Sequence, residues 1–253
     1  MKKQPISLEE ICSHGDRMIT LLELESAPVG VRLLKETEEP LQGAIRLNHH
    51  RYCQALMRAR RGEHVFLDAQ GMNCPAAAAA FGFRPLPENL ENGRGLVGFG
   101  IVNNEQIGQT MFSLMPRFEQ DEIKTIELFP LNQTTAIPDV VVVEDQVERL
   151  MWINLAYLNA IGGERLLAST AILQATCVDS TVIPYQEQRL NFSFGCYGCR
   201  DATDLSGSET VLGFPISQLD SIVRNLEFLS QKAIPTSRAK KAWSALQKQT
   251  KQI

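Results

Sequence analysis

The chain contains the stretch GLVGFGIVNNEQIGQTMFSL at residues 95–114 and a related stretch, TVLGFPISQLDSIVRNLEFL, at residues 210–229. The two align without a gap at an offset of 115, which places Gly98 and Phe99 on Gly213 and Phe214. We interpret each stretch as a strand that leads into a helix. Similarity within one chain at a fixed spacing indicates repeated structural units. The pair therefore predicts an internal duplication.

Two further matches occur upstream in the same order. Residues 55–63 match residues 156–164, where a helical pattern ends at Gly-Glu, and the apolar residues 28–34 lie opposite residues 138–143. Val140 to Val143 is a β-branched run, which is typical of a strand buried on both faces. Alternating strands and helices favour an α/β (or α+β) fold. We predict two pseudo-symmetric halves, each a strand-helix-strand-helix-strand-helix unit.

The matches also predict how the chain is divided. We expect an N-terminal helix in residues 1–26, a first repeat in 27–116, a connector in 117–137, a second repeat with a Cys-x-x-Cys insertion in 138–230, and a basic C-terminal helix in 231–253. In that last segment Trp243 lies on an apolar helical face. We expect Trp243 to dock this helix, and a surface for an anionic ligand is the alternative.

Composition excludes several classes of partner. The net charge of −4 gives no basic excess for nucleic acid, and no window approaches the roughly 18 apolar residues of a membrane span. The N-terminus lacks the apolar core of a signal peptide. We therefore expect a cytoplasmic protein without a membrane partner. Because cytosolic thiols stay reduced, the six cysteines point to packing, metal or redox chemistry instead of structural disulfides.

The strongest local motif is Phe192-Ser-Phe-Gly-Cys196-Tyr-Gly-Cys199-Arg200. Its two cysteines are spaced so that both sulfurs can face one metal, or each other. The motif lies where the second copy is longer than the first, so it is interpreted as an insertion. Function is commonly carried by such added loops.

Cys74 precedes Pro75 and a run of five alanines, so it should cap the N-terminus of a helix. Free N–H groups and the helix dipole lower the pKa of a thiol at that position. Cys177 lies near the equivalent place in the second copy. Cys53 lies in the first turns of another predicted helix, and its counterpart is Asn154.

Four cysteines thus form the candidate metal set: Cys53, Cys74, Cys196 and Cys199. Four thiolates suit an iron–sulfur cluster, with a 4Fe–4S form as one option, or an all-cysteine zinc site. Two metal-free alternatives stay open, a redox dithiol formed by Cys196 and Cys199, and cysteines that only pack the interior. Whether Cys177 joins the site is also open.

Other motifs are weaker. Residues 93–98 spell G-x-G-x-x-G but follow a polar loop, so a turn is favoured over a nucleotide site. Either His49 or His50 could add a ligand near Cys53. Arg200 could bind an anion, balance a thiolate cluster, or form an ordinary surface ion pair.

Several segments together resemble domain of unknown function family 169, a family of uncharacterised bacterial and archaeal proteins. They are residues 27–31, the helix with Cys53, residues 71–74, residues 191–200, Glu209, and residues 213–215. The resemblance covers most of the chain. It implies a soluble prokaryotic protein with cysteine-containing motifs and carries no established reaction.

The leading functional hypothesis is a cytoplasmic protein whose four candidate cysteines bind an iron–sulfur cluster near the interface of the two copies. Its role would be electron transfer to a redox partner or binding of a small anionic ligand. The alternatives are a metal-free enzyme with Cys74 as a thiolate nucleophile and a non-catalytic ligand-binding or structural protein. The sequence indicates neither a reaction nor an oligomeric state.

Overall fold

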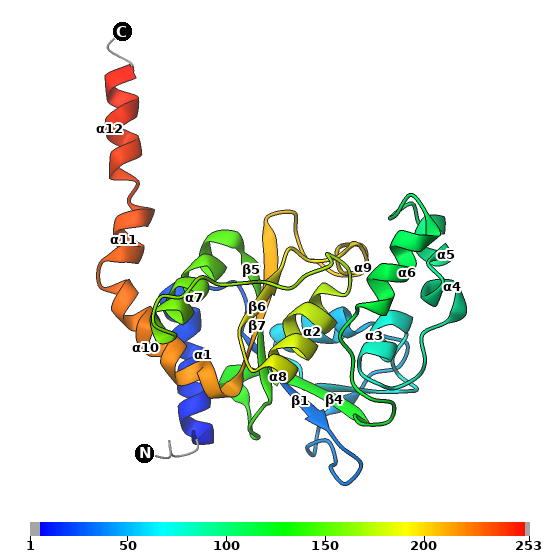
Figure 1. The fold of residues 1–253 in the computed structure, drawn as a ribbon. Coiled ribbons are helices and arrows are strands. Elements are labelled where there is room, and N and C mark those ends of the chain that lie inside the picture. The colour runs from blue at the N-terminus through cyan, green and yellow to red at the C-terminus, as the bar shows by residue number, and fades with distance from the viewer. Residues whose placement is uncertain (1–5, 251–253) are drawn as a thin grey trace.

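The computed structural model describes residues 6–250, and within them seven strands form one mixed sheet (Figure 1). Their order across the sheet is β2-β3-β4-β1-β5-β7-β6, and only β2 and β3 pair in parallel. The strands are β1 (Val29–Leu34), β2 (Ile45–Arg46), β3 (Val65–Asp68), β4 (Thr125–Pro130), β5 (Val140–Gln146), β6 (Asn191–Ser193) and β7 (Glu209–Pro215). The predicted mixture of strands and helices is confirmed.

Helices cover both faces of this sheet. They are α1 (Leu8–Leu22), α2 (Tyr52–Arg60), α3 (Pro75–Ala80), α4 (Glu88–Glu91), α5 (Arg94–Gly98), α6 (Glu105–Ser113), α7 (Val147–Ala160), the π-helix η2 (Ala175–Val182), α8 (Ile183–Glu187), α9 (Tyr197–Ala202), α10 (Leu219–Ser230), α11 (Ala233–Arg238) and α12 (Lys241–Thr250). None of those in the described part of the chain is long and apolar enough to cross a membrane.

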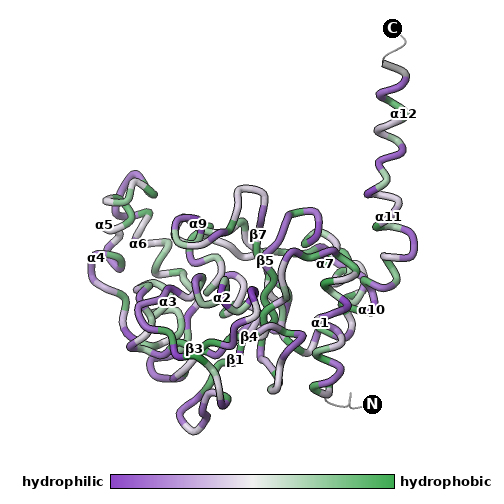
Figure 2. The backbone as a smooth tube through the Cα atoms, turned by 180° about the vertical axis from the view of Figure 1, so that it is seen from behind, coloured by the Kyte–Doolittle hydropathy of each residue, from purple (hydrophilic) through white to green (hydrophobic). Residues whose placement is uncertain are grey.

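The central strand β5 is buried on both faces, as its β-branched run predicts. Val140 and Val142 belong to one apolar core with α2, α3 and η2, whereas Val141 and Val143 belong to a second core with α1, α7 and α10. Seen from behind, the apolar strands lie between the two helical layers (Figure 2). Helices α4, α5 and α6 lie at the far end of the first layer, away from α1 and α10 (Figure 1).

Two sequence predictions about these elements are wrong. Leu96 to Phe99 was expected to form a strand and instead lies in and just after the short helix α5, where Phe99 is 62% exposed. The segment 117–137 was expected to be a connector and instead contains β4, which pairs with β1 from Val29 to Leu34. The reason is tertiary: β4 has a neighbour on each side in the sheet, and the segment around Phe99 has none.

The two halves nevertheless share a strand connectivity. β1 pairs with β4 and β4 with β3, as β5 pairs with β7 and β7 with β6. β4 and β7 both end in Phe-Pro and run into 3-10 turns, η1 (Leu131–Gln133) and η3 (Ile216–Gln218). By this connectivity β4, and not residues 95–99, lies opposite β7. The duplication itself remains a prediction.

The same connectivity changes the interpretation of the Cys-x-x-Cys segment. Helix α3 follows β3, and α9 follows β6 at the corresponding place, with Cys74 and Cys196 as their respective N-caps. If the two halves correspond in this way, the motif has a counterpart at Cys74; its interpretation as an insertion, like the duplication, remains a prediction. Pro215 is the last residue of β7, and η3 follows it.

The chain ends differ in how firmly they pack. Helix α1 begins with a capping box between Ser7 and Glu10 and buries Ile11 and Met18. The predicted C-terminal helix is split into α11 and α12, and α12 extends away from the body (Figure 1). Trp243 is 56% exposed, so the expectation that it docks this helix is wrong. Residues 1–5 and 251–253 of the two predicted terminal helices lie outside the described residues.

Candidate thiol site

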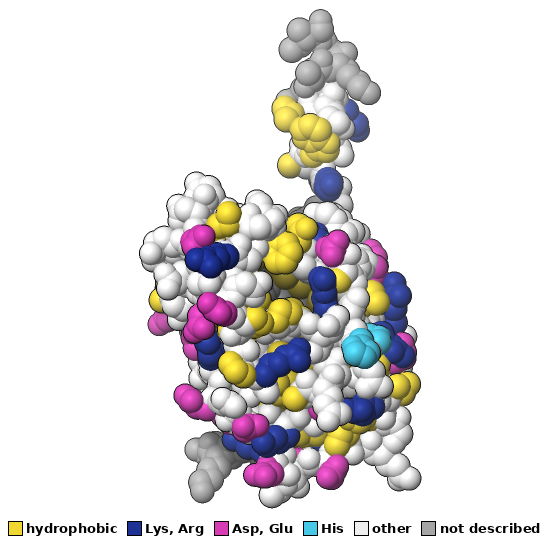
Figure 3. All heavy atoms as spheres, turned by 90° about the vertical axis from the view of Figure 1, so that its right-hand side faces the viewer, with side chains coloured by type: hydrophobic (Ala, Val, Ile, Leu, Met, Phe, Trp, Pro, Cys, Tyr) yellow, Lys and Arg dark blue, Asp and Glu magenta, His cyan; other side chains and the backbone are white. Residues whose placement is uncertain are grey.

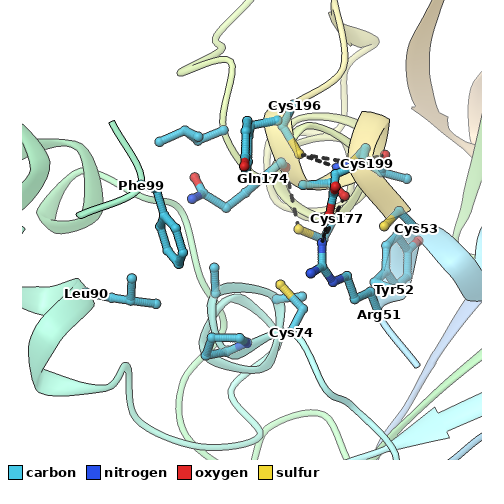
Figure 4. A pocket seen from close by; sticks show the side chains of 18 of the residues that line it. Arg51, Tyr52, Cys53, Cys74, Leu90, Phe99, Gln174, Cys177, Cys196 and Cys199 are labelled. Carbon is cyan, nitrogen blue, oxygen red and sulfur yellow. Dashed lines mark hydrogen bonds and ion pairs between the residues drawn. The ribbon is translucent and has the colours of Figure 1, made fainter. Parts of the chain in front are cut away.

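Five of the six cysteines of the sequence line one cavity of about 340 Å³ (Figure 4). They come from four segments that are distant in sequence: Cys53, Cys74, Cys177, Cys196 and Cys199. The sixth, Cys12, lies elsewhere and donates a hydrogen bond to the Thr134 carbonyl at 3.4 Å. The structure thus brings the four predicted ligands together and adds Cys177. We call this cavity and its five cysteines the thiol site.

Helix α2 and helix α9 hold two sides of the thiol site together. Arg51, the N-cap of α2, donates from Nη1 to the Gly198 carbonyl at 3.1 Å, and Gln54 Nε2 donates to the Ala202 carbonyl at 3.2 Å. Both bonds cross from the turn that carries Cys53 to the Cys-x-x-Cys helix. The guanidinium of Arg51 extends into the cavity near Cys177 and Cys199 (Figure 4).

Cys74 is the N-cap of α3, as predicted, with Pro75 as the first helical residue. Its pKa departs from the prediction: burial raises the pKa of the Cys74 thiol above its ordinary value, although the N–H groups of Ala77 and Ala76 lower it. The helix is short and its alanines are buried, so loss of hydration outweighs the N-terminal field. The expectation of a low-pKa thiolate at Cys74 is therefore wrong.

Cys196 and Cys199 form a thiol pair at the start of α9. Their sulfurs are 3.0 Å apart, and the Cys199 N–H donates to the Cys196 Sγ at 3.3 Å. Gly195, with a φ of +86°, makes the turn from β6 into this helix. The mutual hydrogen bond and burial raise the pKa of Cys196. At Cys199 the hydrogen bond with Cys196 lowers the pKa. The hydrogen bond with Cys53 and burial outweigh that effect and raise the pKa to about 12.

The π-helix η2 supplies Thr176 and Cys177, which lie next to the pair of Cys196 and Cys199. The Thr176 Oγ1 lies 3.1 Å from the Cys199 Sγ, and the Cys177 thiol donates to the Gln174 carbonyl at 3.6 Å. Tyr52 fixes the far turn of η2 through a 2.8 Å hydrogen bond to Thr181. Burial raises the pKa of Cys177 well above its ordinary value. π-turns inside helices are often found at functional sites.

The opposite wall of the cavity is apolar. Leu90, Leu96 and Phe112 of α4, α5 and α6 contribute to it, with Phe99 and Ile101 from the turn after α5. Phe99 and Leu90 face the sulfurs across the cavity (Figure 4). Figure 3 views the end of the molecule that carries these helices, where hydrophobic side chains gather around a hollow. The site can therefore admit a small, largely apolar molecule.

Cysteine sulfurs suit a soft metal, but the Sγ atoms of Cys196 and Cys199 lie closer together than two ligands of one zinc ion would. Thiolates are the preferred ligands of zinc and of iron–sulfur clusters. Two thiolates on one tetrahedral zinc, with bonds of about 2.3 Å, lie about 3.8 Å apart, farther than Cys196 and Cys199. Among the described residues, no three His, Cys, Asp or Glu side chains are grouped so that they could hold an ion. Metal binding would require these side chains to move apart.

The other sequence candidates lie outside the thiol site. His49 and His50 do not line the cavity, and His50 contacts the Asn48 carbonyl at 2.7 Å. Arg200 bonds the backbone carbonyls of Phe194, Ser206 and Glu209, so it braces the loop before β7 and does not face an anion. The glycine-rich residues 93–98 form helix α5 and its N-cap, with Gly93 at a φ of +82°.

Sequence reasoning missed several polar residues of this region, among them Arg51, Thr176 and Glu144. Arg51 and Thr176 line the cavity, and Glu144 lies behind Thr176 at a distance of 3.4 Å between their side-chain oxygens. Arg51 directly follows His49 and His50 and precedes the predicted helix. That position was the one signal in the sequence that it could reach the site. Thr176 and Glu144 carry no local signal, because their meeting depends on the packing of η2 against β5.

The family model of domain of unknown function family 169, described as uncharacterised ArCR, matches residues 17–225. The chain belongs to this family. The matched residues include every cysteine of the thiol site. No curated protein and no solved structure matches the chain. Membership of family 169 therefore agrees with the resemblance in the sequence and adds no reaction.

Proposed function

We propose that this protein binds an iron–sulfur cluster through cysteines of the thiol site and serves in a redox reaction. One observation carries the proposal: five thiols from four separate segments face a single cavity. Packing alone does not require that arrangement, because a thiol packs as a small apolar group anywhere in a core. Cys53, Cys74, Cys196 and Cys199 would be the ligands, with Cys177 as a fifth thiol beside them.

A bound cluster would supply one-electron chemistry, and the protein would supply its surroundings. The apolar wall around Phe99 and Phe112 excludes water from one side of the cavity. Arg51 brings one positive charge to a site whose thiolates are negative when they bind metal. Cys74, Cys177, Cys196 and Cys199 have raised pKa values. Metal binding must displace their protons, so affinity should increase as pH rises.

The test is anaerobic purification followed by iron and acid-labile sulfide analysis and a visible absorption spectrum. We expect iron and sulfide in stoichiometric amounts, and their loss in Cys199→Ser. The matched control is Cys12→Ser, which removes a cysteine remote from the cavity and should leave the iron content unchanged. A colourless wild-type protein that takes up no iron and sulfide on anaerobic reconstitution would refute the proposal.

A second candidate function is favoured by the 3.0 Å contact between Cys196 and Cys199. A dithiol at that distance can form a disulfide after a small side-chain rotation. In exchange with a low-molecular-weight disulfide, the pair would be oxidised to one internal S–S bond while the reagent is reduced to two thiols. Equilibration with glutathione buffers and peptide mass spectrometry tests this, since only this pair should link. An unlinked pair in oxidising buffer contradicts it.

A further inference from the structure

The mouth of the thiol site exposes two aromatic rings to water. Phe99, in the turn after α5, is 62% exposed, and Tyr197 of α9 is 58% exposed, yet both line the cavity. Figure 3 shows hydrophobic side chains around the hollow at this end of the molecule. Apolar groups gathered at a concave surface are typical of a ligand site. An apolar ligand in the cavity would cover both rings.

The fold does not require Phe99 at this position. A Cβ built on Gly98 or on Gly100 would meet no atom within 4 Å, so the turn that carries Phe99 stands clear of its surroundings. The ring of Phe99 faces the sulfurs across the cavity, as Leu90 does (Figure 4). Burying a phenylalanine side chain contributes about 1.5–3 kcal/mol. Because Phe99 is mostly exposed, a ligand that covers it gains most of that contribution.

A guanidinium lies at the sulfur end of the cavity. Arg51 is the one cation among the described residues that line it. Its Nη1 donates to the Gly198 carbonyl at 3.1 Å, and the guanidinium makes no other hydrogen bond within the described part of the chain. Asp201 also lines the cavity, but its carboxylate lies 3.7 Å from Nη1 and its side chain is 63% exposed. Water therefore weakens the interaction between Asp201 and Arg51.

The remaining donors in the cavity indicate which anion fits. A guanidinium presents its N–H groups in a planar fork that matches the two oxygens of a carboxylate. The carboxamide of Gln174 also extends into the cavity (Figure 4), and it has no hydrogen-bond partner among the described residues. A few convergent polar groups in an apolar cavity are the usual composition of a site for a small organic ligand. The volume of about 340 Å³ is at the lower end for such sites.

We infer that the thiol site binds a small carboxylic acid with an apolar body, in its anionic form. The carboxylate is bound by Arg51, and the alkyl or aryl body lies against Phe99 and the wall formed by α4, α5 and α6. This orientation follows from the two ends of the cavity, because Arg51 lies near Cys177 and Cys199 and Phe99 faces them from the other side (Figure 4). The carbon atoms next to the carboxylate are then the ones closest to the sulfurs.

The inference deepens the proposed function, because it names the class of substrate that the same site would present to a bound cluster. It rests on that function only in calling the acid a substrate. Binding of the acid depends on Arg51 and Phe99 and does not require iron. Iron content and acid binding are therefore separate measurements on one sample. Acid binding by an iron-free protein supports this inference and not the proposed function, and an iron-containing protein that binds no acid gives the opposite result.

The experiment is anaerobic titration calorimetry of the full chain with octanoate and with phenylpropanoate as probes. The first has an alkyl body and the second an aryl body, so the pair also shows which body the wall prefers. Octanamide has the length of octanoate without its charge, and acetate has the charge without the apolar body. Octanoate should bind about tenfold more tightly than octanamide, because a charge-assisted pair is stronger than a neutral hydrogen bond. Acetate should show no measurable binding.

Two variants test the two ends of the cavity. Arg51→Gln should weaken octanoate binding about tenfold and leave octanamide binding unchanged, which also shows that the cavity is intact. Phe99→Ser should weaken the binding of both compounds about tenfold, because the apolar contact is lost. The matched controls are Arg61→Gln, at the other end of α2, and Phe228→Ser, which removes a ring of α10 that is 63% exposed. Neither control residue lines the cavity, so both variants should bind like the wild type.

Three results would overturn the inference. The first is that neither octanoate nor phenylpropanoate binds to the wild type. The second is that octanoate and octanamide bind equally well, which would mean that Arg51 does not recognise the carboxylate. The third is that Phe99→Ser and Phe228→Ser bind octanoate alike, which would place the apolar contact outside the thiol site.

Discussion

The buried carboxyl of Glu144 has a consequence for the stability of the protein. Its pKa in the folded protein is about 7, above the ordinary value of 4.5 that it regains on unfolding. Below pH 4.5 both states are protonated, and the group leaves stability unchanged. As pH rises from 4.5 to 7, the unfolded chain releases the proton while the folded chain retains it, so the free energy of unfolding falls.

Replacing Glu144 with Gln should remove this pH dependence. At about 1.4 kcal/mol for each pH unit between 4.5 and 7, the wild type should lose roughly 3 kcal/mol that the variant keeps. Urea unfolding of both proteins at pH 4.5 and pH 8 measures the difference, and other titrating groups largely cancel in the comparison. A constant difference across this range would show that the pKa of Glu144 is not raised above 4.5 in the folded protein.

For single residues, the sequence was informative only where the role depends on neighbours in the chain. Cys74 could be placed because an N-cap before proline is a local pattern, and the Cys-x-x-Cys spacing shows by itself that two sulfurs can meet. The pKa of Cys74 could not be predicted, because it depends on burial by distant segments. Glu144 follows four valines, so in the sequence it resembles the polar end of a strand. Nothing in that pattern indicates its hydrogen bond with Thr176.

Among the elements, η2 and β7 make a close contact that the sequence does not predict. Gly213 of β7 touches the backbone of η2 so closely that a Cβ placed on it would lie 1.8 Å from the Ser180 carbonyl oxygen. Gly98, its partner in the sequence alignment, has no atom within 4 Å of such a Cβ and lies in helix α5. The two glycines align in sequence, yet only one is required by the packing.

Gly213→Ala should therefore destabilise the protein by about 3 kcal/mol, at the upper end for an overpacked site, because η2 must move off the sheet. Gly98→Ala is the matched control, and it should be neutral or stabilise helix α5 by up to about 1 kcal/mol. Chemical denaturation measures both. Since η2 carries Thr176 and Cys177, Gly213→Ala should also change the alkylation rate of Cys177, whereas equal stabilities for the two variants would contradict this packing.

The elements also show why the duplicated order could be only partly predicted. Sequence patterns located the strands β1, β5 and β7 and the helices α2 and α7, because each buries apolar residues. They failed at β4 and α5, since short apolar runs do not distinguish a strand from a helix. Pairing within the sheet decides that question, and pairing is not visible in either segment alone.

In the whole molecule, the two helical layers of the sheet have separate tasks. The layer of α2, α3, η2 and α9 carries the thiol site, and the layer of α1, α7 and α10 carries an apolar core without cysteines from the site. The family match ends at residue 225, within α10. The segments beyond it, α11 and α12, should therefore contribute little to the thiol site.

These two helices should differ in what they contribute to folding. Helix α11 buries Ile234, and its Arg238 binds Glu23 at 2.9 Å and Glu148 at 3.2 Å. Deleting residues 232–253 removes these contacts and should lower the free energy of unfolding by about 3 kcal/mol. Deleting only residues 241–253 removes α12, which extends away from the body, and should change it by less than about 0.5 kcal/mol (Figure 1).

Thermal and urea unfolding of the two truncated chains and the full chain measure these values. Both truncated chains lack α12, so the difference between them reports the contribution of α11. Iron uptake should be unchanged in the chain that ends at residue 240, because α12 lies on the side of the molecule opposite α4, α5 and α6 (Figure 1). A large loss of stability on removing α12 alone would mean that it packs against the body in solution, and the helix would then have to be counted as part of the second core.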